Sequence, residues 1–290
     1  MSATYPFRKM NGLGNDFVVL DQRERALALD ETLTRAIGDR ETGIGFDQLL
    51  TIEPPREDGD AFMGILNSDG SVVEACGNGA RCIAYLLCEE TGRDRVTLET
   101  LGGRLVAWRA GPQTMTVDMG PPHLTARQIP LSIETDDTVA VTLDAPVASF
   151  ALPPFVAVNM GNPHAVFFVE DVASIALERV GPALETHSLF PARANISFVQ
   201  KIGPSHFKAR VWERGAGATR ACGTAACAIG VAAIRRGLAT SPVAVELPGG
   251  PLTIEWRAED GHVLMTGAVA HDYDGHLDPA DFIAKGRAPA

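Results

Sequence analysis

The chain repeats itself at a spacing of about half its length. Gly14-Asn15 recurs as Gly161-Asn162, 147 residues later, and Ala75-Cys76-Gly77 recurs as Ala221-Cys222-Gly223, 146 residues later. Two further matches keep a spacing of 147: Gly102-Gly103 with Gly249-Gly250, and Gly120 with Gly267. Because the matches share one order and nearly one spacing, they predict two domains of similar construction with a cleft between them.

The length of 290 residues also suits two domains, since single cores usually stop growing well below this size. We expect an N-terminal half over residues 1–120 and a C-terminal half over residues 121–267. The segment from about 268 to 290 is expected to pack back on the first half. Its last residues, after about Asp281, look like a frayed tail.

Each half shows the same succession of patterns. A Gly-Asn turn precedes strand-like runs, and a helix is predicted to begin directly after Cys76 and Cys222. The predicted strands are Phe17–Leu20, Gln48–Glu53 and Ala61–Leu66 in the first half, and Ala165–Val169, Ile196–Lys201 and Phe207–Trp212 in the second. The fold class is therefore α/β, more narrowly α+β: two pseudo-symmetric domains, each a curved and mainly antiparallel sheet or barrel around a central helix, with the active site in the cleft.

Composition excludes several classes of function. Lys and Arg number 25 against 36 Asp and Glu, and the net charge of −11 has the wrong sign for binding phosphate backbones or anionic membranes. Hydrophobic residues make up 46% of the chain, which is enough to form buried hydrophobic cores. No secretory signal or long apolar stretch is apparent, so we expect a cytoplasmic protein that binds neither nucleic acid nor membrane.

The five cysteines divide into two groups. Cys76 and Cys222 directly precede helices, where unpaired N–H groups and the helix dipole lower a thiol pKa and bind carboxylates. Two such thiols facing each other would suit inversion of a stereocentre, one removing a proton and the other delivering one. Cys82, Cys88 and Cys227 lie inside the helices, where core packing explains them. An odd number of cysteines without zinc-site spacing predicts neither a disulfide framework nor a metal site.

Six strings carry a resemblance to a known family. They are KMNGLGNDFVVLD (9–21), GFDQLL (45–50), NSDGSVVEACGNGARC (67–82), NMGNPHAVFFVED (159–171), ANISFV (194–199) and VWERGAGATRACGTAACA (211–228). In this order they resemble diaminopimelate epimerase over almost the whole chain. ACGNGAR together with ERGAGATRACGT distinguishes this family from proline racemase-like enzymes and from phenazine-biosynthesis isomerases.

The resemblance implies interconversion of LL- and meso-diaminopimelate, a small-molecule substrate of lysine and peptidoglycan-precursor synthesis, without pyridoxal phosphate or metal. The residues agree on the cofactor. The chain has four lysines, none of them in a glycine-rich phosphate-binding type of loop, and it has no HExxH or GxxxxGK[ST] motif. No cofactor is therefore expected.

The resemblance also implies roles for individual residues. Cys76 and Cys222 are the two acid/base residues, and His164 and Glu213 tune them. The backbone N–H groups of Gly77, Asn78, Gly223 and Thr224 would hold the reacting α-carboxylate. The remaining substrate-binding positions are Asn15, Gln48, Asn67, Asn162, Asn195, Glu213 and Arg214. Tyr273 matches a dimer contact of the family, so a homodimer is expected.

Two alternatives stay open. The chain could be a racemase or epimerase of another amino acid, such as proline or hydroxyproline, although Arg214 and the asparagines favour a substrate with a polar distal group. It could also be a non-catalytic, amino-acid-binding relative. Retention of both cysteines, His164 and Glu213 argues against that reading.

Overall fold

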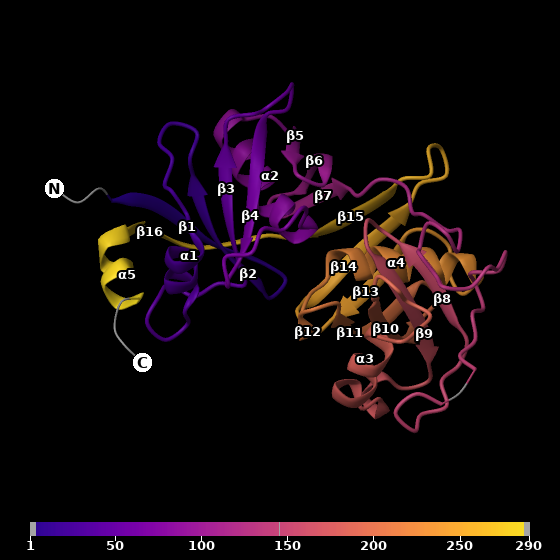
Figure 1. Ribbon diagram of the computed structural model, residues 1–290. Coiled ribbons are helices and arrows are strands. Elements are labelled where there is room, and N and C mark those ends of the chain that lie inside the picture. The colour runs from indigo at the N-terminus through magenta and orange to yellow at the C-terminus, as the bar shows by residue number, and fades with distance from the viewer. Residues whose placement is uncertain (1–3, 145, 287–290) are drawn as a thin grey trace. The chain divides into compact units, whose positions relative to one another are not determined.

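The computed structural model describes residues 4–144 and 146–286, which form two compact units (Figure 1). The first unit ends at Val117 and resumes at Gly267, and the second is Asp118–Thr266. Strand β16 (Ala270–Leu277) pairs antiparallel with β1 (Tyr5–Gly12), so the chain returns to the sheet in which it began.

The sheet of the first unit has the strand order β16-β1-β2-β3-β4-β5-β6-β7. Its remaining strands are β2 (Asn15–Asp21), β3 (Gln48–Glu53), β4 (Ala61–Asn67), β5 (Arg95–Thr100), β6 (Gly103–Gly111) and β7 (Thr114–Asp118). The pairs β2/β3 and β4/β5 are parallel, whereas β1/β2, β3/β4 and β5/β6 are antiparallel.

The sheet of the second unit has the order β15-β14-β13-β11-β10-β9-β8, with β12 beside β11. Its strands are β8 (Phe155–Asn159), β9 (Pro163–Val169), β10 (Asn195–Gly203), β11 (His206–Glu213), β12 (Gly217–Thr219), β13 (Val243–Leu247), β14 (Gly250–Trp256) and β15 (Val263–Ala268). Again two pairs are parallel, β9/β10 and β11/β13, and the other pairs for which the register is defined are antiparallel.

The two sheets repeat one another in register as well as in order. Phe17 lies opposite Gln48 in the first unit, and His164 lies opposite Asn195 in the second, each pair displaced by 147 residues. The turn glycines before these strands share a left-handed conformation, with φ of 85° at Gly14 and 91° at Gly161, which glycine adopts without steric cost. The predicted fold class of two similarly built, mainly antiparallel α/β domains is confirmed.

One long helix packs inside each sheet. Helix α2 (Gly77–Thr91) contacts β1, β2, β5 and β6, and α4 (Gly223–Arg235) contacts β8, β9, β10, β13 and β14. Strands so far apart in a sheet meet one helix only if the sheet curves around it. Close packing explains the small residues of α4: a Cβ at Gly230 would lie 2.6 Å from Ile254. Both helices begin at the predicted residues.

Within residues 4–144 and 146–286, four shorter helices were not predicted. They are α1 (Glu31–Gly38), the 3-10 turn η1 (Val172–Ser174), α3 (Leu177–Glu185) and α5 (Pro279–Gly286). The frayed tail is therefore wrong for residues 281–286, because Asp278 accepts the Ala280 N–H at 2.9 Å and Pro279 takes the first helical position. Phe282 of α5 packs against the core formed by Leu33, Ile37 and Leu277. Residues 287–290 lie outside the described residues.

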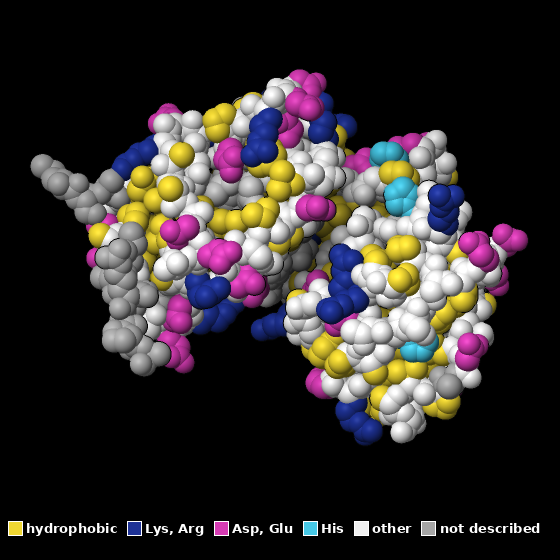
Figure 2. Space-filling model, viewed as in Figure 1, with side chains coloured by type: hydrophobic (Ala, Val, Ile, Leu, Met, Phe, Trp, Pro, Cys, Tyr) yellow, Lys and Arg dark blue, Asp and Glu magenta, His cyan; other side chains and the backbone are white. Residues whose placement is uncertain are grey.

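Neither 4–144 nor 146–286 contains a helix that is both long enough and apolar enough to span a membrane. The visible face of both units carries acidic, basic and apolar side chains interspersed with one another (Figure 2). Charges of both signs mixed in this way are typical of a solvated surface.

Candidate active site

Cys76 is the N-cap of α2. Its backbone is extended, with φ −144° and ψ 107°, and its Sγ accepts a hydrogen bond from the Gly79 N–H at 3.3 Å. A serine or aspartate usually takes this position, where a side-chain acceptor satisfies a free N–H of the first turn. The Cys76 side chain is partly exposed. A thiol so placed receives the electrostatic support that a helix start gives to a negative charge.

The predicted amide side chains of the first unit form two hydrogen-bonded pairs, one of which includes Asn78 in the first turn of α2. Asn78 Nδ2 donates to Asn15 Oδ1 at 3.4 Å, and Gln48 Nε2 donates to Asn67 Oδ1 at 3.2 Å. The topology explains the second contact, because Gln48 and Asn67 are direct cross-strand partners. Gln48 Oε1 and Asn78 Oδ1 are buried acceptors that receive no hydrogen bond from the described residues. Buried acceptors of this kind suit a ligand that brings N–H donors.

Cys222 caps α4 in the second unit. Its side chain is only 5% exposed, and its Sγ lies 3.6 Å from Thr224 Oγ1. Burial raises the pKa of the Cys222 thiol well above its ordinary value, and the neighbouring Glu213 carboxylate raises it further. Cys222 is therefore a protonated thiol at neutral pH.

His164 and Glu213 hold different positions in the second unit. His164 is fully buried in β9, where its Nε2 is 2.7 Å from Asn162 Oδ1. Burial, assisted by the charge of Arg214, lowers the pKa of His164 to about 3, so its ring is neutral. Glu213 ends β11 and accepts a hydrogen bond from the Thr219 hydroxyl. The structure thus brings Glu213 to Cys222 and His164 to Asn162.

Asn195 connects β10 to the loop that carries Arg214. Its Nδ2 donates to the Pro163 carbonyl at 3.0 Å, and its Oδ1 accepts the Arg214 N–H at 2.9 Å. Each amide atom of Asn195 thereby makes one hydrogen bond to the backbone, and one N–H and one oxygen lone pair remain for a ligand. Asn195 thus acts as a brace, a side chain whose hydrogen bonds hold a loop in place, at the start of the loop that carries Arg214.

A second brace of this loop was not foreseen from the sequence. Glu185, at the end of α3 and largely buried, accepts from Trp212 Nε1 at 2.8 Å and from the Gly215 N–H at 3.0 Å. Its carboxylate therefore holds residues on both sides of Glu213 and Arg214. The sequence signal for it was weak, since Glu185 lies far along the chain from the motif it supports.

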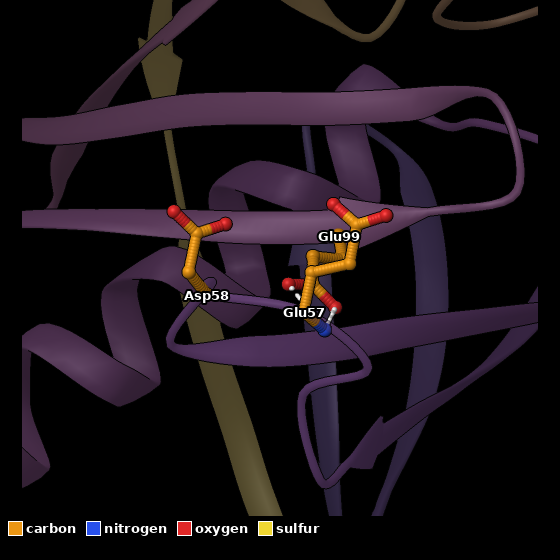
Figure 3. Close-up of side chains that lie close together, drawn as sticks. All are labelled: Glu57, Asp58 and Glu99. Carbon is orange, nitrogen blue, oxygen red and sulfur yellow. Dashed lines mark hydrogen bonds between the residues drawn. The ribbon is translucent and has the colours of Figure 1, made fainter.

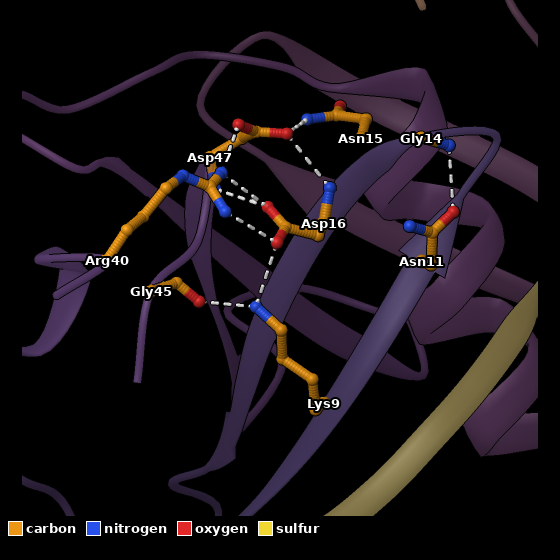
Figure 4. A network of polar contacts seen from close by, with 8 residues as sticks. All are labelled: Lys9, Asn11, Gly14, Asn15, Asp16, Arg40, Gly45 and Asp47. Atoms are coloured by element: carbon orange, nitrogen blue, oxygen red, sulfur yellow. Dashed lines mark hydrogen bonds and ion pairs between the residues drawn. The ribbon is translucent and has the colours of Figure 1, made fainter. Parts of the chain in front are cut away.

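Four charged residues of the first unit were also missed. Lys9, Asp16, Arg40 and Asp47 form a connected network that ends on the Asn15 side chain (Figure 4). Asp16 and Asp47 directly neighbour the predicted residues Asn15 and Gln48. Their proximity in the sequence could have singled them out.

Tyr273 and the three remaining cysteines lie in different surroundings. Tyr273 is on β16, an edge strand, is 48% exposed, and packs its ring edge-on against Phe7 at 6.0 Å. Cys82, Cys88 and Cys227 are buried, as core packing predicts. Burial raises the pKa of Cys82 to about 12, which leaves it an unreactive thiol.

One acidic cluster resembles a metal site in outline. Glu57, Asp58 and Glu99 bring carboxylate oxygens within 4.8 Å of one another (Figure 3). The Glu99 carboxylate, however, accepts the N–H groups of Arg56, Glu57 and Gly59 at 2.6 to 3.1 Å. Burial would raise the pKa of Glu99, and these N–H bonds lower it instead. The cluster is explained by a carboxylate that anchors the loop between β3 and β4.

The chain is similar to known proteins over most of its length. The family profile for diaminopimelate epimerase matches residues 7–125 and 156–271. The chain is 52% identical over 272 residues to the diaminopimelate epimerase of Rhodospirillum centenum, covering 93% of this chain and 91% of that one. It is 47% identical to the diaminopimelate epimerase of Rhodopseudomonas palustris strain BisB18, covering 97% and 98% of the two chains.

Solved structures agree on the fold. A hydroxyproline epimerase from Agrobacterium vitis, determined with bound trans-4-OH-L-proline, matches with a TM-score of 0.65 over 96% of this chain and 94% of its own, at 16% identity. At that identity the match speaks for the fold alone. The extent and level of the sequence matches decide the family: the chain belongs to the diaminopimelate epimerases.

Proposed function

We propose that the protein is an isomerase that interconverts LL-2,6-diaminopimelate and meso-diaminopimelate, with Cys76 and Cys222 as its two acid/base residues. The reaction would serve lysine biosynthesis and the supply of peptidoglycan precursors. One observation carries the proposal: the two halves of the chain present a cysteine as the N-cap of equivalent helices. The identity of the substrate is inferred from the family to which the chain belongs.

The proton transfers need one thiolate and one thiol. In one direction the Cys76 thiolate takes the α-hydrogen as a proton, leaving the C–H electron pair on the substrate, and the Cys222 thiol gives its proton to the opposite face. The α-carbon is inverted, and the protonation states of the two cysteines are exchanged. The resting state suits this direction, since burial and Glu213 keep Cys222 protonated while Cys76 accepts a hydrogen bond from Gly79.

The helix starts would stabilise the charge that develops. As the α-carbon loses its proton, negative charge spreads onto the adjacent carboxylate, which needs fixed N–H donors rather than mobile water. The backbone N–H groups of Gly77 and Asn78, and those of Gly223 and Thr224, lie in the first turns of α2 and α4. A helix N-terminus supplies such donors together with about half a positive charge.

The distal half of the substrate is a second amino acid group. Gln48 and Asn78 offer buried acceptor oxygens, which suit an ammonium group, and we propose Asn15, Asn67, Asn162 and Asn195 as the surrounding polar set. Arg214 is exposed, and its guanidinium suits a carboxylate. A substrate without a polar distal group would leave these groups unmatched.

We propose that the reaction uses neither pyridoxal phosphate nor a metal. A Schiff base needs a lysine that is free to lose its proton. Two of the four lysines are engaged by acceptors: Lys9 by the Asp16 carboxylate and the Gly45 carbonyl, and Lys201 by the Leu238 carbonyl. The thiol pair provides acid and base without such a group.

Three further features belong to the same proposal. The two compact units correspond to the two epimerase halves, with the strand after Gly267 belonging to the first. The protein acts as a cytoplasmic homodimer. Tyr273, an exposed aromatic residue on an edge strand, lies in the dimer interface.

The test is a stereochemical assay of the reduced protein. LL-diaminopimelate, L-proline and trans-4-hydroxy-L-proline are incubated separately, and the isomers are resolved by chiral chromatography. We expect that only diaminopimelate is converted, to a mixture of the LL and meso isomers. This conversion should be lost in Cys76→Ala and in Cys222→Ala. Cys82→Ala and Cys227→Ala, which alter buried cysteines of the same two helices, serve as controls and should retain activity. Turnover of proline instead would overturn the proposed substrate.

A further inference from the structure

Asp16 and Asp47 hold the ends of two neighbouring strands together. The Asp16 N–H donates to Asp47 Oδ2 and the Asp47 N–H donates to Asp16 Oδ1, both at 2.9 Å. This reciprocal pair joins the start of β2 to the residue before β3. Both aspartates accept backbone N–H groups, so their side chains cannot rotate freely.

Two cations neutralise the pair. Arg40 donates to Asp16 through both terminal nitrogens, at 2.9 and 3.0 Å, and to Asp47 Oδ1 at 2.7 Å. Lys9, largely buried, donates to Asp16 Oδ2 at 3.1 Å. Burial alone would raise the pKa of Asp16, but the hydrogen bonds and charges of Arg40 and Lys9 outweigh it and lower the pKa to about 2. The Asp16 carboxylate therefore stays ionised through the physiological range.

The network ends on the amide of Asn15 (Figure 4). Asn15 Nδ2 donates to Asp47 Oδ2 at 2.9 Å, while Asn15 Oδ1 faces Asn78 Nδ2 at 3.4 Å. A rotation of the amide by 180° would bring its oxygen against the Asp47 carboxylate and its NH2 group against the Asn78 NH2 group. The first contact would then join two acceptors and the second would join two donors, so neither could be a hydrogen bond. The acceptor oxygen of Asp47 therefore selects one of the two amide orientations.

The second unit builds the same strand pair without these charges. The register of β8, β9 and β10 places Ala157, Pro163 and Ala194 at the positions of Lys9, Asp16 and Asp47. The parallel pair nevertheless forms with the same register. The fold thus does not require the network, and a role at the Asn15 side chain accounts for it better.

We propose that Asp47, supported by Arg40 and Asp16, is a positioning residue that fixes the Asn15 amide for binding the substrate's zwitterionic group. The inference rests on the proposed function for its substrate. Asn15 then offers the substrate two groups at fixed places. Its second N–H is a donor on the Asp47 side, and the remaining lone pair of its oxygen is an acceptor on the Asn78 side. A fixed order discriminates between a carboxylate and an ammonium group.

Kinetics of three variants test the proposal. Asp47→Ala should raise the KM for LL-diaminopimelate about tenfold while kcat changes less than about twofold, because a charge-assisted bond that orients a binding group is lost. Asp47→Asn keeps an oxygen for the Asn15 and Asp16 N–H groups and should recover most of the affinity. Asp21→Asn is the matched control, an aspartate at the other end of β2 that is paired with Arg23. Its KM should equal that of the unaltered protein.

An NMR measurement tests the same inference without turnover. The side-chain amide resonances of Asn15 are assigned by their loss in Asn15→Asp. The two amide protons should be well separated in the unaltered protein and in Asp21→Asn, and should converge in Asp47→Ala, where one proton loses its carboxylate. If these shifts occur in a protein that does not act on diaminopimelate, the proposed function fails and the positioning role stands. Unchanged Asn15 resonances, or an unchanged KM in folded Asp47→Ala, would overturn the inference.

Discussion

Cys76 and Cys222 occupy the same backbone position in two copies of one structural unit. Their φ and ψ angles are −144° and 107° against −130° and 108°, and each residue caps the helix that its sheet encloses. The turn glycines 102 and 249 donate to the carbonyl two residues before each cysteine, at 2.8 and 2.7 Å. The side chains differ, however. Cys76 is partly exposed and bonded to the Gly79 N–H, whereas Cys222 is buried beside Glu213.

This difference predicts unequal reactivity towards alkylation. At pH 8 iodoacetamide should modify Cys76 at least about tenfold faster than Cys222, because the thiolate is the nucleophile and Cys222 is both buried and protonated. Modification of Cys222 should accelerate only as the pH rises well above 9. The rates are measured by quenching at intervals and quantifying the labelled peptides by mass spectrometry.

Cys82 and Cys227 are internal controls for that experiment. Both are buried within the helices and should stay unmodified while the protein is folded. Labelling of Cys222 as fast as Cys76 at pH 8, with these two cysteines still protected, would refute the assigned protonation states.

His164 predicts how stability depends on pH. Its pKa falls from 6.5 to about 3 on folding, so between these values the unfolded chain binds a proton that the folded protein excludes. Stability should be unaffected by this group above pH 6.5 and should fall below it, by roughly 1.4 kcal/mol per pH unit at most. Urea unfolding at pH 7 and pH 5 measures the decline.

The matched variant is His164→Phe, since Phe17 stands at the equivalent position in the first unit. The loss of stability between pH 7 and pH 5 should be smaller by roughly 2 kcal/mol than in the unaltered protein. An identical loss in both proteins would mean that His164 is not the group responsible.

Much of the fold follows from patterns in the sequence, and the reasons are local. Strand β3 occupies the predicted Gln48–Glu53, and α2 begins directly after Cys76, as predicted. Helix α3 was missed because Pro182 lies inside it. That helix depends on burying Leu177, Val180 and Leu184 in the core of its unit, a tertiary contribution that helix propensity does not contain.

In the candidate site, too, some features could be predicted from the sequence and others could not. Cys76, Cys222 and the amide residues lie in compact motifs, so they could be identified from the sequence. The contacts of the residues that brace them could not be predicted, even where, as for Asp47, the residue itself adjoins a predicted one. Glu185 meets Gly215 across 30 residues of chain, and Asp47 meets Asn15 across 32. Such contacts depend on strand order and register, which no local motif encodes.

Glu185 predicts a binding defect that originates away from any substrate contact. Glu185→Ala removes the acceptor of Trp212 Nε1 and of the Gly215 N–H, so the Arg214 loop loses its brace. We expect a loss of about 2 kcal/mol in the free energy of unfolding and a several-fold rise in KM. Glu185→Gln, which keeps one acceptor oxygen, should lie between.

The control for this variant is Glu178→Ala. Glu178 lies on the same helix and forms an exposed ion pair with Arg210. Exposed pairs contribute little, so this change should move neither quantity by more than the error of measurement. Equal effects of the two variants would show that the helix matters, rather than the carboxylate at Glu185.

Tyr273 predicts the oligomeric state. If the exposed edge strand β16 is the dimer interface, Tyr273→Ala should convert a dimer into a monomer in sedimentation velocity, because a buried aromatic anchor is lost from both subunits. Ile202→Ala, which removes an exposed apolar side chain from the second unit, should leave the dimer intact. A dimer that persists in Tyr273→Ala would place the interface elsewhere.

The two-thiol mechanism is the central claim, and exchange of the α-hydrogen in heavy water tests it most directly. LL-diaminopimelate is incubated with the reduced protein, and at early times the meso product and the remaining LL isomer are separated and analysed by mass spectrometry. Because one cysteine removes the hydrogen and the other delivers a solvent deuteron, the product should carry deuterium at the inverted carbon while the recovered LL isomer keeps its hydrogen. Conversion should be lost in Cys76→Ala and in Cys222→Ala. A first-formed product that retains the substrate's own α-hydrogen, or conversion that survives in either variant, would contradict the mechanism.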